Sequence, residues 1–438
     1  MSPDTTDVVD TIARRLSDAE HVLAVTNAPG NLMHTPRQTR HPWSALSLSD
    51  GNPALALFFA ELTAEDTGHR DVLHAYLSAG LEDGSPLPET TLFNGPCALT
   101  FAAHAAAVGT GGYATLLEWL DEAVVAKVRQ QARTVHAHIA DGVAIATWSG
   151  YDVVTGISGT GRLLLARHGV TGDPATGEAL TEVLTTLVET ALADAVVADG
   201  RAVPAWWVTH SPTATAGHIT EHLNLGLAHG VAGPLALLAL ALRAGVRVPR
   251  HEEAITRIVD LLWRWRKVDE HGPYWPDWVT PDQYDGTAPP GPRIRDAWCY
   301  GAAGIARALY LAGAAVGNNA WQEDAHHAFH GVIATDGGAI GTASLCHGRA
   351  GLLQIALRMS HDSGLPQYRS FADALAARLT AEFDPEKPFG YHYLHPVASL
   401  GPDRPGFLEG AAGIALALHG YAIGRPPATG WDAALLLS

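Results

Sequence analysis

The sequence predicts an all-α fold built from repeated pairs of helices. Gly-x-x-Gly or Gly-x-x-Ala segments occur seven times in the 438 residues, and an Ala/Leu-rich stretch follows them. Their starts are 44 to 74 residues apart, whereas two helices with two connections need about 40 residues or more. Each interval therefore has room for one inner and one outer helix. Repeats of this length that bury apolar faces against their neighbours form solenoids or closed rings.

The inner helices are expected directly after the glycines. Stretches such as 233–242 and 304–312 are apolar all round, which is typical of a buried helix. Glycine at the start of such a helix lets neighbouring backbones approach closely. The seven segments begin at Gly51, Gly95, Gly156, Gly230, Gly301, Gly348 and Gly410.

The stretches between the inner helices are amphipathic and predict an outer layer. Their expected ranges are 7–17, 67–81, 113–139, 177–197, 252–266, 320–333, 367–382 and 431–437. The best strand signal is 203–209. Three long irregular segments, at about 198–224, 268–293 and 384–405, interrupt a chain that we otherwise expect to be one domain over 1–438. Loops this long are usually functional or mobile. The first two could form the rim of a peptide-binding cavity or simply be long connectors.

Composition excludes several classes of function. The formal net charge is −17 and basic residues are not clustered, which argues against nucleic-acid binding. Three cysteines do not make a disulfide framework, and a reducing compartment fits them better. The first residues lack the pattern of a signal peptide, and no apolar run reaches the roughly 18 residues of a transmembrane helix. We therefore expect a cytoplasmic protein, with peripheral association with a membrane complex left open.

Two cysteines and a histidine lie just before the glycines of two repeats. Cys299 precedes Gly301 by two residues, and Cys346 and His347 directly precede Gly348. Thiolate and imidazole suit Zn²⁺, and three protein ligands leave open the fourth position that a catalytic zinc needs. A free cysteine is more often a small buried apolar residue, and we expect this of Cys97, which has no histidine beside it.

Several motifs together resemble those of the lanthionine cyclase family, the LanC-like proteins. They are Trp-Cys-Tyr-Gly at 298–301, Cys-His-Gly at 346–348, Leu-Ala-His-Gly at 227–230, and the segments 151–159 and 406–413. The resemblance extends from about residue 43 to residue 421 and is that of a stand-alone cyclase. It implies an α/α toroid, a double ring of seven inner and seven outer helices, with one zinc ion per chain at one end of the ring.

The resemblance also implies a reaction. LanC-like cyclases add peptide cysteine thiols to dehydroalanine or dehydrobutyrine and form the lanthionine or methyllanthionine thioether rings of lanthipeptides, including antibiotics. The substrate implied is a dehydrated precursor peptide, and a dehydratase and a transporter are partners left open. Position by position, the resemblance makes Cys299, Cys346 and His347 the zinc ligands, gives His229 and Asp152 acid–base roles, and places Arg295 and Tyr300 along the site.

Other interpretations of the same residues stay open. Asp152 could instead cap the helix that starts near Gly156, and for Glu409 a capping role is favoured over a place in the site. A LanC-like protein could add glutathione to dehydrated residues, or serve as a peptide-binding scaffold. A purely structural zinc would need a fourth protein ligand, which no motif supplies. Other α/α toroids include glycosidases, which need paired carboxylates where this chain offers Cys and His.

Overall fold

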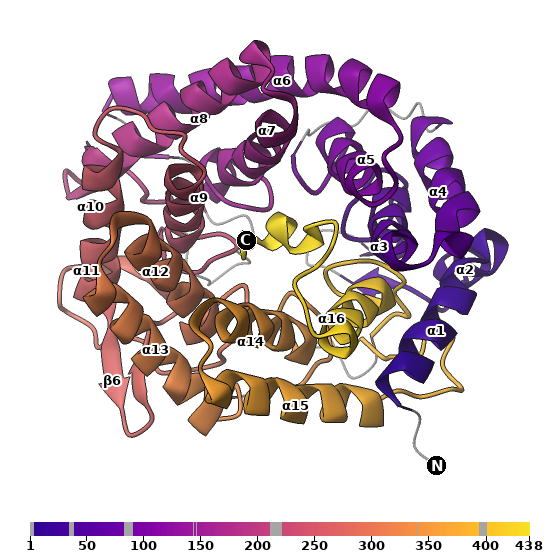
Figure 1. Ribbon diagram of the computed structural model, residues 1–438. Helices are drawn as coiled ribbons and strands as arrows, with labels where there is room; N and C mark the ends of the chain where they lie inside the picture. The colour runs from indigo at the N-terminus through magenta and orange to yellow at the C-terminus, as the bar shows by residue number, and fades with distance from the viewer. Residues whose placement is uncertain are drawn as a thin grey trace. The chain divides into compact units, whose positions relative to one another are not determined.

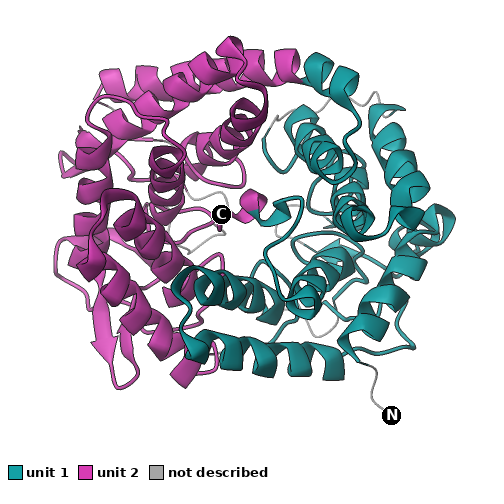
Figure 2. Cartoon of the chain, viewed as in Figure 1, with its two compact units in different colours: residues 1–120, 340–432 teal, residues 121–339, 433–438 magenta. Residues whose placement is uncertain are grey.

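The computed structural model describes residues 4–34, 39–82, 91–142, 144–145, 147–210, 221–338, 340–393 and 401–438. These ranges contain 16 α-helices, and their strands are only two or three residues long. Contacts divide the chain into unit 1, residues 1–120 and 340–432, and unit 2, residues 121–339 and 433–438 (Figure 2). The expectation of one domain over the whole chain stays a prediction. Within the described ranges, every helix is too short or too polar to cross a membrane.

The inner helices begin at or within two residues of the seven glycines. In unit 1 they are α3 (Asn52–Glu65), α5 (Pro96–Thr110), α14 (Arg349–Ser363) and α16 (Ala411–Ile423); in unit 2 they are α7 (Ile157–Thr171), α9 (Ala232–Arg243) and α12 (Ala302–Val316). In unit 1, α14 packs on α16, α16 on α3, and α3 on α5; in unit 2, α9 contacts both α7 and α12. Every residue of α9 except the last is buried. The prediction of a buried inner layer is confirmed.

The outer helices cover this layer within each unit (Figure 1). They are α1 (Thr5–Leu16), α4 (Arg70–Glu82), α15 (Pro366–Ala381), α6 (Ala114–Ala140), α8 (Pro174–Leu192), α10 (His251–Trp265) and α13 (Asn319–Ala334). Thus α1 packs on α16, α4 on α3 and α15 on α14, while α8 packs on α7 and α13 on α12. The long helix α6 is tied to α7 by the ion pair between Arg167 and Asp121, at 2.6 Å. These helices lie within a few residues of seven of the eight expected ranges.

The expectation of an eighth outer helix at 431–437 is wrong. Trp431–Leu435 forms a single 3₁₀ helix, and the whole segment through Leu437 is buried instead of lying in the outer layer. Only Asp432 is polar there, and its carboxylate accepts a hydrogen bond from Arg358 Nε at 2.5 Å. A segment without a polar face has no side to present to water, so it is buried. Two short helices were also missed, α2 (Ala19–Thr26) and α11 (Pro281–Tyr284).

The irregular segments contain the strands. The expected strand at 203–209 is only partly right: β4 (Ala202–Pro204) ends at its proline and pairs with β3 (Asp194–Val196). The segment 268–293 is more regular than expected, and part of each of 198–224 and 384–405 lies outside the described residues. In and beside the segment 268–293, β6 (Lys267–Asp269) pairs with β7 (Gly272–Tyr274), β8 (Trp278–Val279) pairs with β5 (Leu223–Asn224), and α11 (Pro281–Tyr284) is a short helix. Near the start of the chain, β1 (Met33–His34) pairs with β2 (Thr39–Arg40).

Backbone hydrogen bonds join the loops that precede neighbouring inner helices. In unit 2 the amide of Val153 donates to the carbonyl of Ala228 at 3.0 Å, and the amide of Ala228 donates to the carbonyl of Cys299 at 3.3 Å. In unit 1 the corresponding donor–acceptor pairs are Cys346–Leu408, Phe407–Ser49 and Leu48–Phe93, at 2.7 to 2.9 Å. Each loop is therefore positioned by its neighbour through main-chain groups.

The second glycine of the Gly-x-x-Gly segments explains how these loops fit. At Gly233, Gly304 and Gly413, a Cβ atom would overlap the carbonyl oxygen of the residue six positions earlier in the chain. The loop before each helix therefore folds back onto the first turn of that helix, where only glycine leaves room. Of the residues singled out by sequence, these folded-back loops contain His229, Cys299, Tyr300 and Glu409.

Candidate metal centre

The loop that carries Cys299 is held by an aspartate. Asp296 Oδ1 accepts a hydrogen bond from the amide of Ala302, the first residue of α12, at 2.7 Å. Its other oxygen accepts from Arg293 Nη1 at 2.6 Å. Gly301 has φ +92°, a conformation that a residue with a side chain rarely adopts. Cys299 itself is 4% exposed, so its thiol lies in a pre-formed and largely buried position.

The loop that carries Cys346 and His347 belongs to unit 1. The amide of Cys346 donates to Leu408 O at 2.9 Å, which ties this loop to the one before α16. One ring nitrogen of His347, Nδ1, is 3.8 Å from Glu409 Oε1, and the other, Nε2, is 3.5 Å from the hydroxyl of Tyr393. A metal-binding histidine gives one ring nitrogen to the ion and uses the other to contact an orienting group, so one of these two neighbours could orient the His347 ring.

Cys299, Cys346 and His347 form a group that could hold a metal ion. Each offers one ligand atom, and these atoms all lie within 4.8 Å of one another. Ligand atoms about 2.0 to 2.3 Å from a tetrahedral zinc ion lie closer together than this limit, so the spread is compatible with zinc. The donor set of two thiols and an imidazole fits Zn²⁺ and leaves one position open.

The third cysteine has a different environment. Cys97 is fully buried in α5, and burial raises the pKa of its thiol to about 12. A thiol that stays protonated is a poor metal ligand. The expectation that Cys97 is a core residue is confirmed by its burial.

His229 and Asp152 form a close pair in unit 2. His229 Nδ1 lies 2.5 Å from Asp152 Oδ2, and Asp152 is completely buried while the histidine side chain is 26% exposed. Because a carboxylate only accepts hydrogen bonds, Nδ1 carries the proton and Nε2 is the nitrogen left to exchange protons. The ring lies against Trp148, with the ring centroids 5.1 Å apart.

Asp152 does not cap α7, the role that sequence left as an alternative, because the N-terminus of α7 has no side-chain cap; Asp152 holds the turn just before it instead. Its other oxygen, Oδ1, accepts from the amide of Thr155 at 2.7 Å and from the amide of Gly156 at 2.5 Å, at the start of α7. The two roles use different oxygens, so they are compatible. Glu409 does not cap α16, whose N-terminus has no side-chain cap. Its carboxylate instead binds Arg404 and faces His347.

Arg295 and Tyr300 flank Cys299 and contact each other. The guanidinium carbon of Arg295 lies 5.5 Å from the centre of the Tyr300 ring, a cation–π distance. The Tyr300 hydroxyl accepts a hydrogen bond from Asn224 Nδ2 at 3.1 Å, and its ring centroid is 6.3 Å from that of His229. Unit 2 thus brings Arg295, Tyr300, His229 and Asp152 into one continuous set of contacts.

Two residues of this set were missed by sequence reasoning. Asn224 precedes Gly230 by six residues and holds the Tyr300 hydroxyl, and Asp277 lies 3.4 Å from Arg295 Nη2. Burial raises the pKa of Asp277 to about 6, against the opposing effect of Arg295. Both residues lie in or next to short strands of the irregular segments, where no periodic pattern marks them.

Residues 42–436, most of the chain, match the family described as lanthionine synthetase C-like protein. The chain belongs to this family. The nisin biosynthesis protein NisC of Lactococcus lactis subsp. lactis is 27% identical over 222 residues, 49% of this LanC-like chain and 48% of NisC. The match thus spans about half the length of that curated relative.

The fold of the LanC-like chain is also found in a solved structure described as nisin cyclase. The two agree with a TM-score of 0.73 at 21% sequence identity, over 90% of this chain and 92% of the other. This likeness shows that the fold is an α/α toroid, as the sequence predicted.

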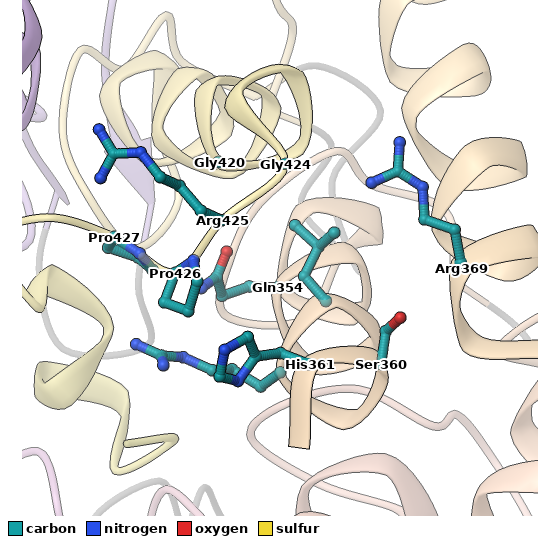
Figure 3. A pocket seen from close by; sticks show the side chains of 11 residues that line it. Gln354, Ser360, His361, Arg369, Gly420, Gly424, Arg425, Pro426 and Pro427 are labelled. Atoms are coloured by element: carbon teal, nitrogen blue, oxygen red, sulfur yellow. The ribbon is translucent and has the colours of Figure 1, made fainter. Parts of the chain in front are cut away.

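Two hollows of the LanC-like chain lie away from these residues. One, of about 100 Å³, lies between α14 and α16 in unit 1, with Arg369 and Arg425 on opposite sides (Figure 3). Both arginines have an acidic partner, Asp373 and Glu65 respectively, so their charge is largely balanced. The other hollow, of about 320 Å³, lies in unit 2 between α6 and the segment 145–157.

Proposed function

We propose that this LanC-like protein is a zinc-dependent lanthipeptide cyclase. It would act on a dehydrated precursor peptide and join cysteine thiols to dehydroalanine or dehydrobutyrine, forming lanthionine or methyllanthionine rings. The observation that carries the proposal is the group of Cys299, Cys346 and His347 in a member of this family. Because the chemistry needs free thiols, we place it in a reducing compartment, the cytoplasm.

Cys299, Cys346 and His347 would hold the zinc ion and leave one ligand position for the peptide. When bound, the ion would lower the pKa of the peptide thiol and so supply a thiolate near neutral pH. Of Glu409 and Tyr393, the one that faces the ring nitrogen not bound to the ion would orient the His347 ring. The largely buried position of Cys299 limits water around the reacting groups.

His229 would manage the proton of the addition. The thiolate sulfur forms a bond to the β-carbon of the dehydro residue, the carbon–carbon double bond becomes a single bond, and negative charge develops on the carbonyl oxygen. The α-carbon must then receive the proton that the thiol lost. His229 Nε2 is suited to this transfer because Asp152 binds Nδ1 and fixes both the tautomer and the ring orientation.

Arg295 would stabilise the negative charge that develops on the carbonyl oxygen. Its guanidinium is held between Asp277 and the Tyr300 ring, so it is in place before the substrate arrives. Tyr300 contacts both Arg295 and His229 and thereby links the groups that handle charge and proton. Burial raises the pKa of Tyr300, which keeps its hydroxyl protonated.

The experiment incubates the protein with a dehydrated precursor peptide encoded beside its gene and counts free thiols by alkylation and mass spectrometry. Ring closure leaves the mass of the peptide unchanged, so the loss of alkylatable thiols is the informative signal. We expect thiols to disappear only when zinc is bound. Thiols that persist with a zinc-loaded protein and a suitable peptide would contradict the proposal, and thioether formation with added glutathione would replace it.

The metal ligands are tested by Cys346→Ala, with Cys97→Ala as the matched control. We expect the Cys346 variant to lose zinc and ring closure, because two ligands bind the ion much more weakly than three. The Cys97 variant should keep zinc and activity, at a cost in stability of about 1 kcal/mol for the small cavity. Zinc content and thiol counts check both. Full zinc content in the Cys346 variant would exclude it as a ligand.

A further inference from the structure

His222 is a buried imidazole without a hydrogen-bond partner for its ring in the part of the chain that the structure describes. Its side chain is 2% exposed, and neither ring nitrogen has a partner among the described residues. Its backbone is fixed, because amide and carbonyl both pair with Val208, at 3.0 and 2.9 Å. A buried polar group without a partner costs about 1 to 3 kcal/mol. A folded chain that keeps such a group beside its reactive residues suggests that the partner arrives with a ligand.

A second buried histidine shows that this fold can satisfy one nitrogen of a buried imidazole. His251 is also 2% exposed, and its Nε2 is bonded to the carbonyl of Leu238 at 2.9 Å, while its Nδ1 has no partner among the described residues. Both histidines lie in unit 2. His222 differs in that neither of its ring nitrogens has a partner in the part of the chain that the structure describes.

Five aromatic side chains of unit 2, including His222, contact one another in a closed circuit, which we call the aromatic collar. The contacts run in the order Trp148, His222, Trp278, Tyr300, His229 and back to Trp148, with ring centroids 5.6, 6.1, 6.1, 6.3 and 5.1 Å apart. Three of these contacts are edge-on, so ring edges and faces alternate along the circuit. The pairing of β5 with β8 brings His222 and Trp278 together. His222 and His229 both contact Trp148, so His222 lies one ring away from the residue proposed to move the proton.

The chemistry of the collar suits one part of the proposed substrate. A dehydro residue has a flat α-carbon, since its carbon–carbon double bond is conjugated with the peptide group. Flat conjugated groups pack well against aromatic faces and edges. Burial lowers the pKa of His222 to about 4, so its imidazole is neutral near pH 7, with one nitrogen that donates and one that accepts. A peptide group offers the complementary carbonyl and amide.

We propose that His222 is a substrate-binding residue that hydrogen bonds to the backbone of the dehydro residue while the aromatic collar holds its flat unsaturated group beside His229. The inference rests on the proposed function and deepens it, because it assigns a subsite for the dehydro residue to a residue outside the motifs.

The test replaces His222 with Phe, which keeps an aromatic ring of similar size and removes both nitrogens. We expect KM for the dehydrated peptide to rise about tenfold or more, the loss of roughly one good hydrogen bond, with a smaller change in kcat. The thermal midpoint should stay the same or rise, because an unsatisfied buried polar group is removed. Zinc content should not change. His222→Gln, which restores a donor and an acceptor, should recover part of the affinity.

An unchanged KM in the His222→Phe variant would overturn the proposal. If the thermal midpoint also falls, His222 is a structural residue satisfied by water. Failure of the proposed function is seen separately, as absence of ring closure by the unaltered protein. In that case, binding of a synthetic dehydroalanine peptide compared with its alanine analogue, measured through tryptophan fluorescence, still tests His222 directly.

Discussion

Asp152 shows how one residue can serve both the fold and the chemistry. One carboxylate oxygen holds the turn before α7 through the amides of Thr155 and Gly156, and the other holds His229. Asn at this position could keep the first role, because its side-chain oxygen still accepts from the two amides. It could not keep the second, because its NH₂ group would face the nitrogen that should donate. The two roles can therefore be separated by a single substitution.

We predict that Asp152→Asn lowers kcat about 10²- to 10⁴-fold, as expected when a catalytic histidine is held in the wrong tautomer. Unfolding free energy should fall by about 1 kcal/mol or less, since the hydrogen bonds to the amides of Thr155 and Gly156 survive. Thiol counting during ring closure and chemical denaturation measure the two quantities. Asp152→Ala serves as the comparison and should lose both activity and these hydrogen bonds. Near-normal activity in the Asn variant would reduce Asp152 to a residue that only holds the turn before α7.

The motif residues were predictable from sequence, and the residues around them were not. Cys299, Cys346, His347, His229 and Asp152 all precede a glycine-marked helix start, which made them visible. Their assignment to zinc and proton transfer stays a prediction. Asn224, Asp277 and His222 come from irregular segments in which nothing in the spacing shows what lies opposite. Their neighbours are determined by the pairing of β5 with β8, which joins residues more than 50 positions apart.

At the scale of an element, the second glycine of each Gly-x-x-Gly segment couples a helix to its preceding loop. Gly304, in the first turn of α12, leaves no room for a Cβ because the carbonyl of Trp298 lies against it. That loop also carries Cys299. A side chain at Gly304 would therefore push on the loop and displace a proposed zinc ligand.

We predict that Gly304→Ala destabilises the protein by about 1 to 3 kcal/mol through overpacking and also weakens zinc retention. Gly169 is the matched control: it lies near the end of α7, is exposed, and has open space within 4 Å of the point where a Cβ would lie. Gly169→Ala should stabilise by about 0.5 to 1 kcal/mol, as alanine does in an exposed helix. Denaturant unfolding and zinc content check both variants. Equal effects at the two positions would show that loop contact is not what requires glycine.

The outer helices show which elements sequence can locate. Their hydrophobic faces recur with helical spacing over three or more turns, so α6, α10 and α13 were found within one residue at each end. The segment 431–437 failed because seven residues are too few to reveal a periodicity, and because its apolar residues face every direction. Burial of such a short segment depends on what the rest of the chain leaves uncovered.

At the scale of the whole molecule, the last residues of the chain accept hydrogen bonds from buried side chains of unit 2. Residues 433–438 belong to unit 2, although the residues directly before them belong to unit 1. Arg307, 1% exposed in α12, donates to the carbonyl of Leu437 from Nε at 3.0 Å and from Nη2 at 2.6 Å. Trp298, the neighbour of Cys299, donates from Nε1 to the carbonyl of Leu435 at 2.9 Å.

We predict that removing residues 436–438 destabilises the protein by more than about 4 kcal/mol, because two buried leucines and the acceptor of a buried arginine are lost. Removing Ser438 alone is the control. It takes away one hydrogen bond from Arg162, at 2.9 Å, and should cost about 1 kcal/mol. Thermal unfolding measures both. A thermal midpoint unchanged in the longer truncation would show that the terminal segment only covers the core without supporting it.

The main-chain hydrogen bonds between neighbouring loops have a consequence for how such a protein can change. Because those bonds involve amides and carbonyls only, they do not themselves require a particular side chain just before each helix-starting glycine. The seven positions are Asp50, Asn94, Thr155, His229, Tyr300, His347 and Glu409. Substitution at one of these positions would therefore leave the main-chain hydrogen bonds between the loops in place. New reactivity could arise here, through evolution or engineering, without a change of fold.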